Sequence, residues 1–250
     1  MWKSRLLLSL LLLAAVHVQA STFMPMNVAS QVDQADLIFA GTVIGVESVP
    51  VKDRSFAFTY VTFQIDETLK GAADGPTITL RFAGGRANGM VYSVGGVPRF
   101  ARDGRHVLFV RDNDRLALPL AGDARGKLDL VEHPVTREPM VVDPRGYVIG
   151  GIRDEEWSLS GLKVDAFGQL ERPERVAEVV SQEGVTVTFD QPVVSDETVP
   201  ASQVLDELRA LIQSRAFAPA FRRASLVRSA SPANVPGTDP FAMPARSKAQ

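Results

Sequence analysis

Three consecutive carboxylates, Asp154, Glu155 and Glu156, have the spacing best suited to acid–base chemistry in this chain. Paired carboxyl groups can divide general acid and general base work, as they do in glycoside hydrolysis. Adjacent acids in a loop are more often a solvated edge, and nothing else in the sequence marks a pocket beside them. A hydrolase that uses Asp154 or Glu156 is therefore the weakest of the functions considered.

Histidine and cysteine offer little further catalytic chemistry. The chain has no cysteine and three histidines, and only His106 and His133 lie beyond the first twenty residues. Neither has a histidine or glutamate at the helical spacing of a metalloprotease motif. The sequence also lacks a Gly-x-Ser-x-Gly nucleophile elbow. We therefore predict that the chain is not an enzyme and has no cofactor or metal of its own.

A glycine-rich segment from Gly84 to Gly96 is a candidate binding loop. Such a loop could be mobile and lie at the rim of a small barrel, where OB folds present their ligand surfaces. Four arginines flank it and could contact an anionic sugar or a carboxylate: Arg81, Arg86, Arg99 and Arg102. The alternative is that the glycines serve turn geometry and the arginines are solvated. The residues assigned to the candidate loop site are Gly84, Gly85, Arg86 and Gly89.

The first twenty residues have the pattern of a secretory signal peptide. Lys3 and Arg5 precede an apolar run from Leu6 to Val16, and small residues follow at the cleavage positions up to Ala20. This run of eleven residues is too short for a membrane-spanning helix, which needs about 20. We predict cleavage after Ala20 and a secreted or periplasmic product that begins at Ser21.

Composition limits the fold and the partners. Hydrophobic residues make up 45% of the 250 residues and charged residues 22%, as in ordinary globular proteins. The formal net charge of −2 provides no basic excess for binding nucleic acid. An exported chain without cysteine has no disulfides, so the stability of its fold must come from its hydrophobic core alone. The mature chain is long enough to bury such a core.

The candidate functional residues named above must be positioned by short β-strands, which are separated by Gly, Pro and Asp turns. That pattern favours a barrel or sandwich over a parallel α/β sheet. Helices are expected from Asn27 to Ala35, after Pro173, and from Ser202 to Arg215. The expected strands are Asp36–Ser48, Phe56–Leu69, Thr77–Phe82, Met90–Val94, Arg105–Arg111, Leu116–Leu120, Lys127–Glu132, Met140–Val142, Tyr147–Ile152 and Val185–Phe189.

We predict a mainly β fold, namely an OB-like antiparallel barrel with extra strands and one or two C-terminal helices. The predicted organisation is a signal peptide (1–20), the barrel (21–133), a β-rich extension with a short helix (134–200), a C-terminal helical segment (201–228) and a disordered tail (229–250).

The order of signals from residue 21 to about 131 resembles the netrin-like module of the tissue inhibitors of metalloproteinases. The predicted mature terminus, Ser21-Thr22-Phe23-Met24-Pro25, stands where those inhibitors read Cys-Thr-Cys-x-Pro. Ala35–Val43 is similar to the first strand of that module. The strand Tyr60–Ile65 is followed by Glu67–Gly71, like the family strand that closes in Lys-Gly, and Gly104–Val110 resembles a late barrel strand.

This resemblance implies a mode of binding. In that family the α-amine and carbonyl of the first residue chelate the partner's catalytic zinc, and the next side chain enters the specificity pocket. By position these residues are Ser21 and Thr22, and Phe23, Met24 and Pro25 complete the partner-binding set. Ser21 and Phe23 replace the cysteines whose disulfides hold the terminus on the barrel, so burial of Phe23 and Met24 would have to hold it instead.

The function expected from these features is non-enzymatic binding outside the cytoplasm. The sharper form is binding or inhibition of an exported zinc metalloprotease, without nucleic-acid partners and without a membrane anchor. The alternatives are a cell-envelope ligand-binding or structural module and, less favoured, the carboxylate-dependent hydrolase.

Overall fold

The computed structural model describes residues 27–52, 55–165, 168–171, 198–218, 221 and 226–232. The predicted signal peptide, the segment 21–25, the helix after Pro173, the strand Val185–Phe189 and most of the predicted tail lie outside the described residues. None of the described helices is long and apolar enough to cross a membrane.

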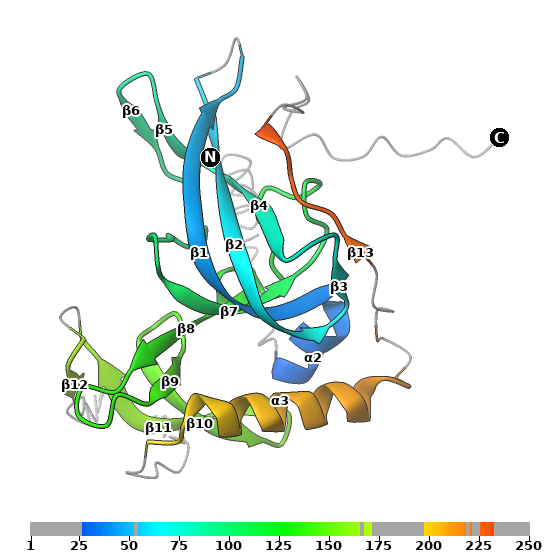
Figure 1. The fold of residues 1–250 in the computed structure, drawn as a ribbon, viewed down its shortest axis with the longest axis vertical. Coiled ribbons are helices and arrows are strands. Elements are labelled where there is room, and N and C mark those ends of the chain that lie inside the picture. The colour runs from blue at the N-terminus through cyan, green and yellow to red at the C-terminus, as the bar shows by residue number, and fades with distance from the viewer. Residues whose placement is uncertain are drawn as a thin grey trace, which may run out of the picture.

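The described chain is mainly β, as predicted, and is built on a nine-stranded antiparallel sheet (Figure 1). The strands lie in the order β12-β11-β10-β9-β8-β7-β1-β2-β4. Their bounds are β1 Leu37–Pro50, β2 Ala57–Lys70, β4 Thr77–Ala83, β7 Arg105–Val110, β8 Lys127–Glu132, β9 Pro139–Val142, β10 Tyr147–Arg153, β11 Glu156–Val164 and β12 Leu170–Glu171.

The remaining elements surround this sheet. The helices are α2 Val28–Gln34, the 3-10 helix η1 Asp123–Gly126 and α3 Ala201–Arg215, and the short strands are β3 Ala72–Ala73, β5 Gly85–Ala87, β6 Met90–Tyr92 and β13 Leu226–Val227. Strands β9–β12 continue the same sheet as β1, β2, β4, β7 and β8, so no break in pairing separates the predicted extension from the predicted barrel.

The first half of strand β1, up to Val43, is buried on both faces because its side chains alternate between two cores. Leu37, Phe39 and Val43 contribute to a core with β2, β4 and β7. Ile38 and Ala40 face a second core, which includes α2 and α3. In Figure 1 both helices lie at the lower end of β1 and β2. Apolar burial of this kind contributes about 25 cal/mol per Å² and is the main force that holds a cysteine-free fold together.

The outer edge of β4 is covered by two other segments. The amide of Ala83 donates to the carbonyl of Ala117 (2.7 Å), and the amide of Ala230 donates to the carbonyl of Thr79 (2.8 Å). An isolated bridge joins Leu120 to Val110 of β7. The segment 117–121 therefore connects β7 with β4 and encloses the core between β1, β2, β4 and β7.

Helix α3 is attached to the sheet by charged and polar contacts. Arg215 forms ion pairs with Asp33 of α2 and with Glu155 in the β10–β11 turn. Nearer the middle of the helix, the Glu207 carboxylate accepts a hydrogen bond from the Ile152 amide (2.6 Å). These contacts fix the helix across β10 and α2.

Candidate functional site

The glycine-rich segment forms a β-hairpin, which we call the rim hairpin (residues 84–92). Strands β5 and β6 pair in register, with Gly85 opposite Tyr92 and Ala87 opposite Met90. The turn residues Asn88 and Gly89 have φ values of 51° and 75°. Two successive left-handed residues are typical of the tight turns that match the twist of a hairpin. The predicted loop is therefore an ordered hairpin, and Figure 1 shows it projecting beside β1.

Two glycines allow the chain to enter this hairpin. Gly84 has a φ of +91°, and a Cβ there would lie 2.6 Å from the carbonyl oxygen of Tyr92. Gly85 has a φ of +140°, and its Cβ would lie 2.5 Å from the Thr59 hydroxyl and 2.7 Å from the Ser48 hydroxyl. The hairpin thus crosses β2 and β1 at a closeness that only glycine permits.

The projecting part of the rim hairpin exposes apolar side chains. Met90 is 52% exposed and Val91 is 62% exposed. Arg86 lies opposite Val91 and is exposed as well. At the base, Tyr92 contacts the ring of Phe56 at a centroid distance of 6.4 Å. The structure therefore brings the predicted residues Gly84, Gly85, Arg86 and Gly89 together in one hairpin, and their binding role stays a prediction.

The four arginines expected around this segment differ in burial and in their contacts. Arg81 is not a surface residue: it is buried, pairs with Asp114 (3.0 Å) and lies over the ring of Phe58. Its position on β4 is covered by the loop that contains Asn113, whose side chain accepts from the Arg81 amide. Arg86, Arg99 and Arg102 are exposed, and none of them forms an ion pair within the described part of the chain.

Sequence reasoning missed a buried polar cluster around His106. The Nδ1 atom of His106 lies 2.6 Å from the Asp129 carboxylate, which also accepts from Lys127. Because an ionised carboxylate only accepts, Nδ1 carries the proton in this pair. Nε2 is buried without a hydrogen-bond partner among the described residues. The rings of Phe63 and Phe100 flank the imidazole edge-on.

The protonation of this cluster follows from its burial. Desolvation lowers the pKa of His106 below its ordinary value, although the hydrogen bond to Asp129 acts in the opposite direction. For Asp129, burial raises the pKa, but the His106 hydrogen bond and the Lys127 charge outweigh it and leave the pKa lowered. The cluster therefore favours a neutral imidazole beside a carboxylate.

The remaining titratable candidates lie in turns. Asp154 and Glu155 form the β10–β11 turn with φ values of 50° and 64°, and Glu156 is exposed at the start of β11. Glu155 is engaged by Arg215 (2.9 Å). In the β8–β9 turn, His133 Nδ1 accepts from the amides of Val135 and Thr136, both at 3.1 Å. The contacts of Glu155 and His133 therefore stabilise the β10–β11 turn and the β8–β9 turn, respectively.

The predicted partner-binding terminus leads directly into α2. Ser21, Thr22, Phe23, Met24 and Pro25 lie outside the described residues. Asn27 caps the helix by accepting from the Ser30 amide (2.8 Å), and the Val28 amide donates to the Glu155 carbonyl (3.0 Å). The point where the segment joins the fold is therefore fixed beside the β10–β11 turn.

No group of three or more His, Cys, Asp or Glu side chains within the described ranges could hold a metal ion. No protein-family model, curated protein or solved structure matches the chain. The likeness to the inhibitors of metalloproteinases therefore rests on the sequence features quoted above.

Proposed function

We propose that this chain is an exported, non-enzymatic binding protein that contacts a protein partner through the rim hairpin. The observation that carries the proposal is the exposure of Met90 and Val91 on a projecting hairpin. Exposed apolar side chains grouped on one feature favour an interaction site, and methionine adapts well to a partner surface.

The anchoring of the hairpin supports the same function. Gly84 and Gly85 hold it against β1 and β2, and Tyr92 packs on Phe56. A binding element that is ordered before it meets its partner loses less conformational entropy on association. The hairpin is thus suited to presenting Arg86, Met90 and Val91 together.

Site-specific photo-crosslinking tests this proposal. A benzoylphenylalanine at position 91 is expected to give a discrete adduct in the cells that export the chain. The control position is Val135, which is 81% exposed in the β8–β9 turn. Serine at Met90 should weaken the adduct formed at position 91. Equal adducts at positions 91 and 135, or none at position 91, would contradict the proposal.

The finer form of the proposal is that the partner is a zinc metalloprotease bound through the mature terminus. In addition to the resemblance, the fixed start of α2 supports this form. The six residues from Ser21 to Met26 can reach about 20 Å from Asn27 when extended. The Ser21 α-amine, with an ordinary pKa near 8, would be the ligand to the partner's zinc.

An added residue at the terminus tests the metalloprotease form. The correctly cleaved protein and a version with one alanine before Ser21 would be compared against a panel of zinc metalloproteases, with the terminus confirmed by mass spectrometry. Inhibition that the added alanine abolishes would support the chelate. Inhibition by neither form would exclude the metalloprotease as partner and leave the proposed binding through the hairpin to its own test.

A further inference from the structure

The upper half of β1 has an edge that no described strand covers. On one side β1 pairs with β2 along its length, up to Pro50 opposite Ala57. On the other side it pairs with β7 only from Leu37 to Thr42. The Val43 amide and carbonyl then bond Gly104 and Asp103. From Gly45 to Pro50 this second edge has no backbone partner among the described residues.

A β-bulge at Ile44 determines which backbone N–H and C=O groups of β1 point toward the open edge. The pairing with β2 shifts at Ile44, so that Val46 and Ser48 lie opposite Val61 and Thr59. They therefore take the face of β1 that Val43 occupies before the bulge. In a strand, residues that share a face direct their backbone N–H and C=O groups to the same edge. Val46 and Ser48 thus present both groups at the open edge, and Pro50, which has no N–H, limits it.

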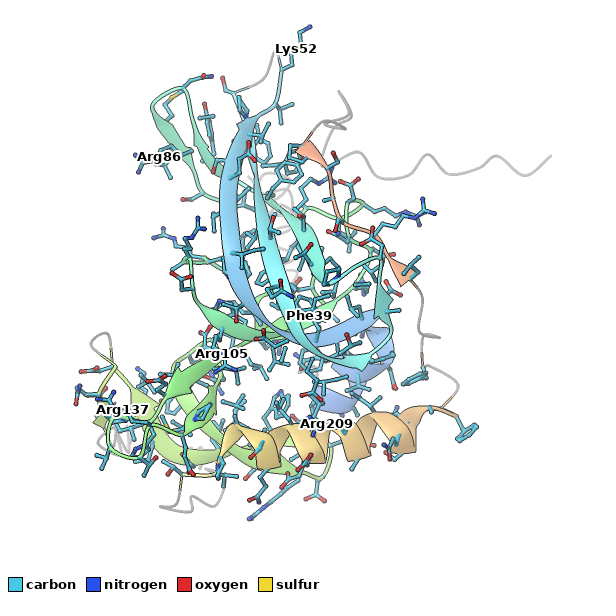
Figure 2. All side chains as sticks on the ribbon, in the orientation of Figure 1. Phe39, Lys52, Arg86, Arg105, Arg137 and Arg209 are labelled. Atoms are coloured by element: carbon cyan, nitrogen blue, oxygen red, sulfur yellow. The ribbon has the colours of Figure 1, made fainter. Side chains whose placement is uncertain are left out.

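The side chains around this open edge are apolar and basic. Ile44 is 39% exposed and Val46 is 46% exposed. Exposed arginines lie at both ends of the stretch, with Arg86 on the rim hairpin and Arg105 at the start of β7 (Figure 2). Arg102 lies in the turn whose Asp103 bonds Val43. The acids among these neighbours are Glu47, Asp103 and Asp66, and the Asp66 carboxylate lies 4.0 Å from Arg105. Lys52, just beyond Pro50, adds a further exposed cation, so the four basic groups outnumber the three acids.

We propose that the open edge of β1 binds an extended acidic segment of the partner by strand addition. The N–H and C=O groups of Val46 and Ser48 would pair with its backbone, as in other strand-addition complexes. Its acidic side chains would meet Arg86, Arg102 and Arg105, and alternate apolar side chains would pack on Val46. This inference rests on the proposed function and specifies the chemistry of the partner at the same rim.

A designed peptide pair provides the probe. Acetyl-Val-Glu-Val-Glu-Val-Glu-amide should shift the backbone amide resonances of Val46 and Ser48 and slow their hydrogen exchange. The peptide with lysine in place of glutamate should bind at least about tenfold more weakly, and salt should weaken the acidic peptide because exposed charges are screened. Equal binding of both peptides, or no effect on these two amides, would overturn the inference.

Backbone variants locate the binding at the edge. Val46→Pro removes the outward N–H at a position that an edge strand tolerates and should weaken the acidic peptide about fivefold or more, whereas Val46→Thr retains the N–H and should bind normally. If Val46→Pro unfolds, an acidic peptide N-methylated at alternate residues replaces it and should fail to bind. Equal binding of the methylated and unmethylated peptides would overturn the inference.

Two other occupants would be recognised by the same measurements. Concentration-dependent dimers that disappear in Val46→Pro would assign the edge to a second copy and overturn the inference. Slow exchange of the Val46 and Ser48 amides in the free monomer would show that the chain covers its own edge, with the same consequence. Adducts at position 91 with no peptide binding would refute the inference and leave the proposed function standing.

Discussion

Gly85 crosses β1 so closely that a Cβ on it would lie 2.7 Å from the hydroxyl oxygen of Ser48. This contact sets the direction in which the rim hairpin leaves the sheet. The glycines that made the segment a candidate binding loop are therefore needed for a close crossing, and the surface offered to a partner consists of the side chains beyond it.

Alanine at position 85 should disturb this crossing. We expect Gly85→Ala to lower the free energy of unfolding by about 1–3 kcal/mol, because the new Cβ has no room and the φ is unfavourable. Gly95→Ala is the matched control, since nothing lies within 4 Å of a Cβ there, and should change stability by less than about 0.5 kcal/mol. Urea unfolding measures both. Equal effects of the two substitutions would contradict the close crossing.

Removal of the Glu207 carboxylate should loosen α3 from β10. Glu207→Ala leaves the Ile152 amide without its acceptor and should lower the free energy of unfolding by about 1–2 kcal/mol. Glu207→Gln keeps an acceptor oxygen and should lower the free energy of unfolding by less. Hydrogen exchange of the Ile152 amide, compared across the three proteins, reports the contact directly. Unchanged exchange in Glu207→Ala would exclude the bond.

The two arginines of α3 should differ in their contribution to stability because their partners differ in burial. Asp33 has a side chain only 5% exposed, so Arg215→Ala leaves a buried carboxylate unpaired and should lower the free energy of unfolding by about 2 kcal/mol. Arg209 pairs with Glu67, which is 38% exposed, and Arg209→Ala should lower it by less than about 1 kcal/mol. Chemical denaturation compares them, and the reverse order would refute this account of the helix attachment.

Stability should fall as the pH falls below the ordinary pKa of histidine. Burial lowers the pKa of His106 in the folded chain, so the unfolded chain binds more protons just below about pH 6.5. The free energy of unfolding should therefore decrease between about pH 7 and pH 5, and His106→Gln should make this decrease shallower. Because the pKa of Asp129 is lowered as well, a further loss should follow below about pH 4. Stability that rises on acidification from pH 7 would contradict the burial of neutral His106.

Period-two alternation predicts β1 and β2 well because their two faces contact different cores. Val61 and Phe63 lie in the core shared with β4 and β7, and Phe58 and Tyr60 lie in another. The helix expected at Ser202–Arg215 is confirmed as α3. The expected strand Leu116–Leu120 contains only the bridge at Leu120, because this segment spans between β7 and β4.

Local patterns gave no signal where tertiary contacts determine the structure. The sequence pattern does not predict strand β11, because its residues Glu156–Val164 are mostly half-buried and include a glycine. The pairing of His106 with Asp129 depends on the register between β7 and β8, which a single sequence does not reveal. The burial of Arg81 likewise depends on a loop that folds over β4 from more than thirty residues away.

The most direct test of the central claim is the affinity between this chain and the protein captured at position 91. Calorimetry would compare the unaltered chain with the double variant Met90→Ser/Val91→Ser and with Val135→Ser. We expect the double variant to bind at least about tenfold more weakly, since two apolar side chains lose their burial against the partner, and Val135→Ser to bind normally. Unchanged affinity in the double variant would contradict binding through the rim hairpin.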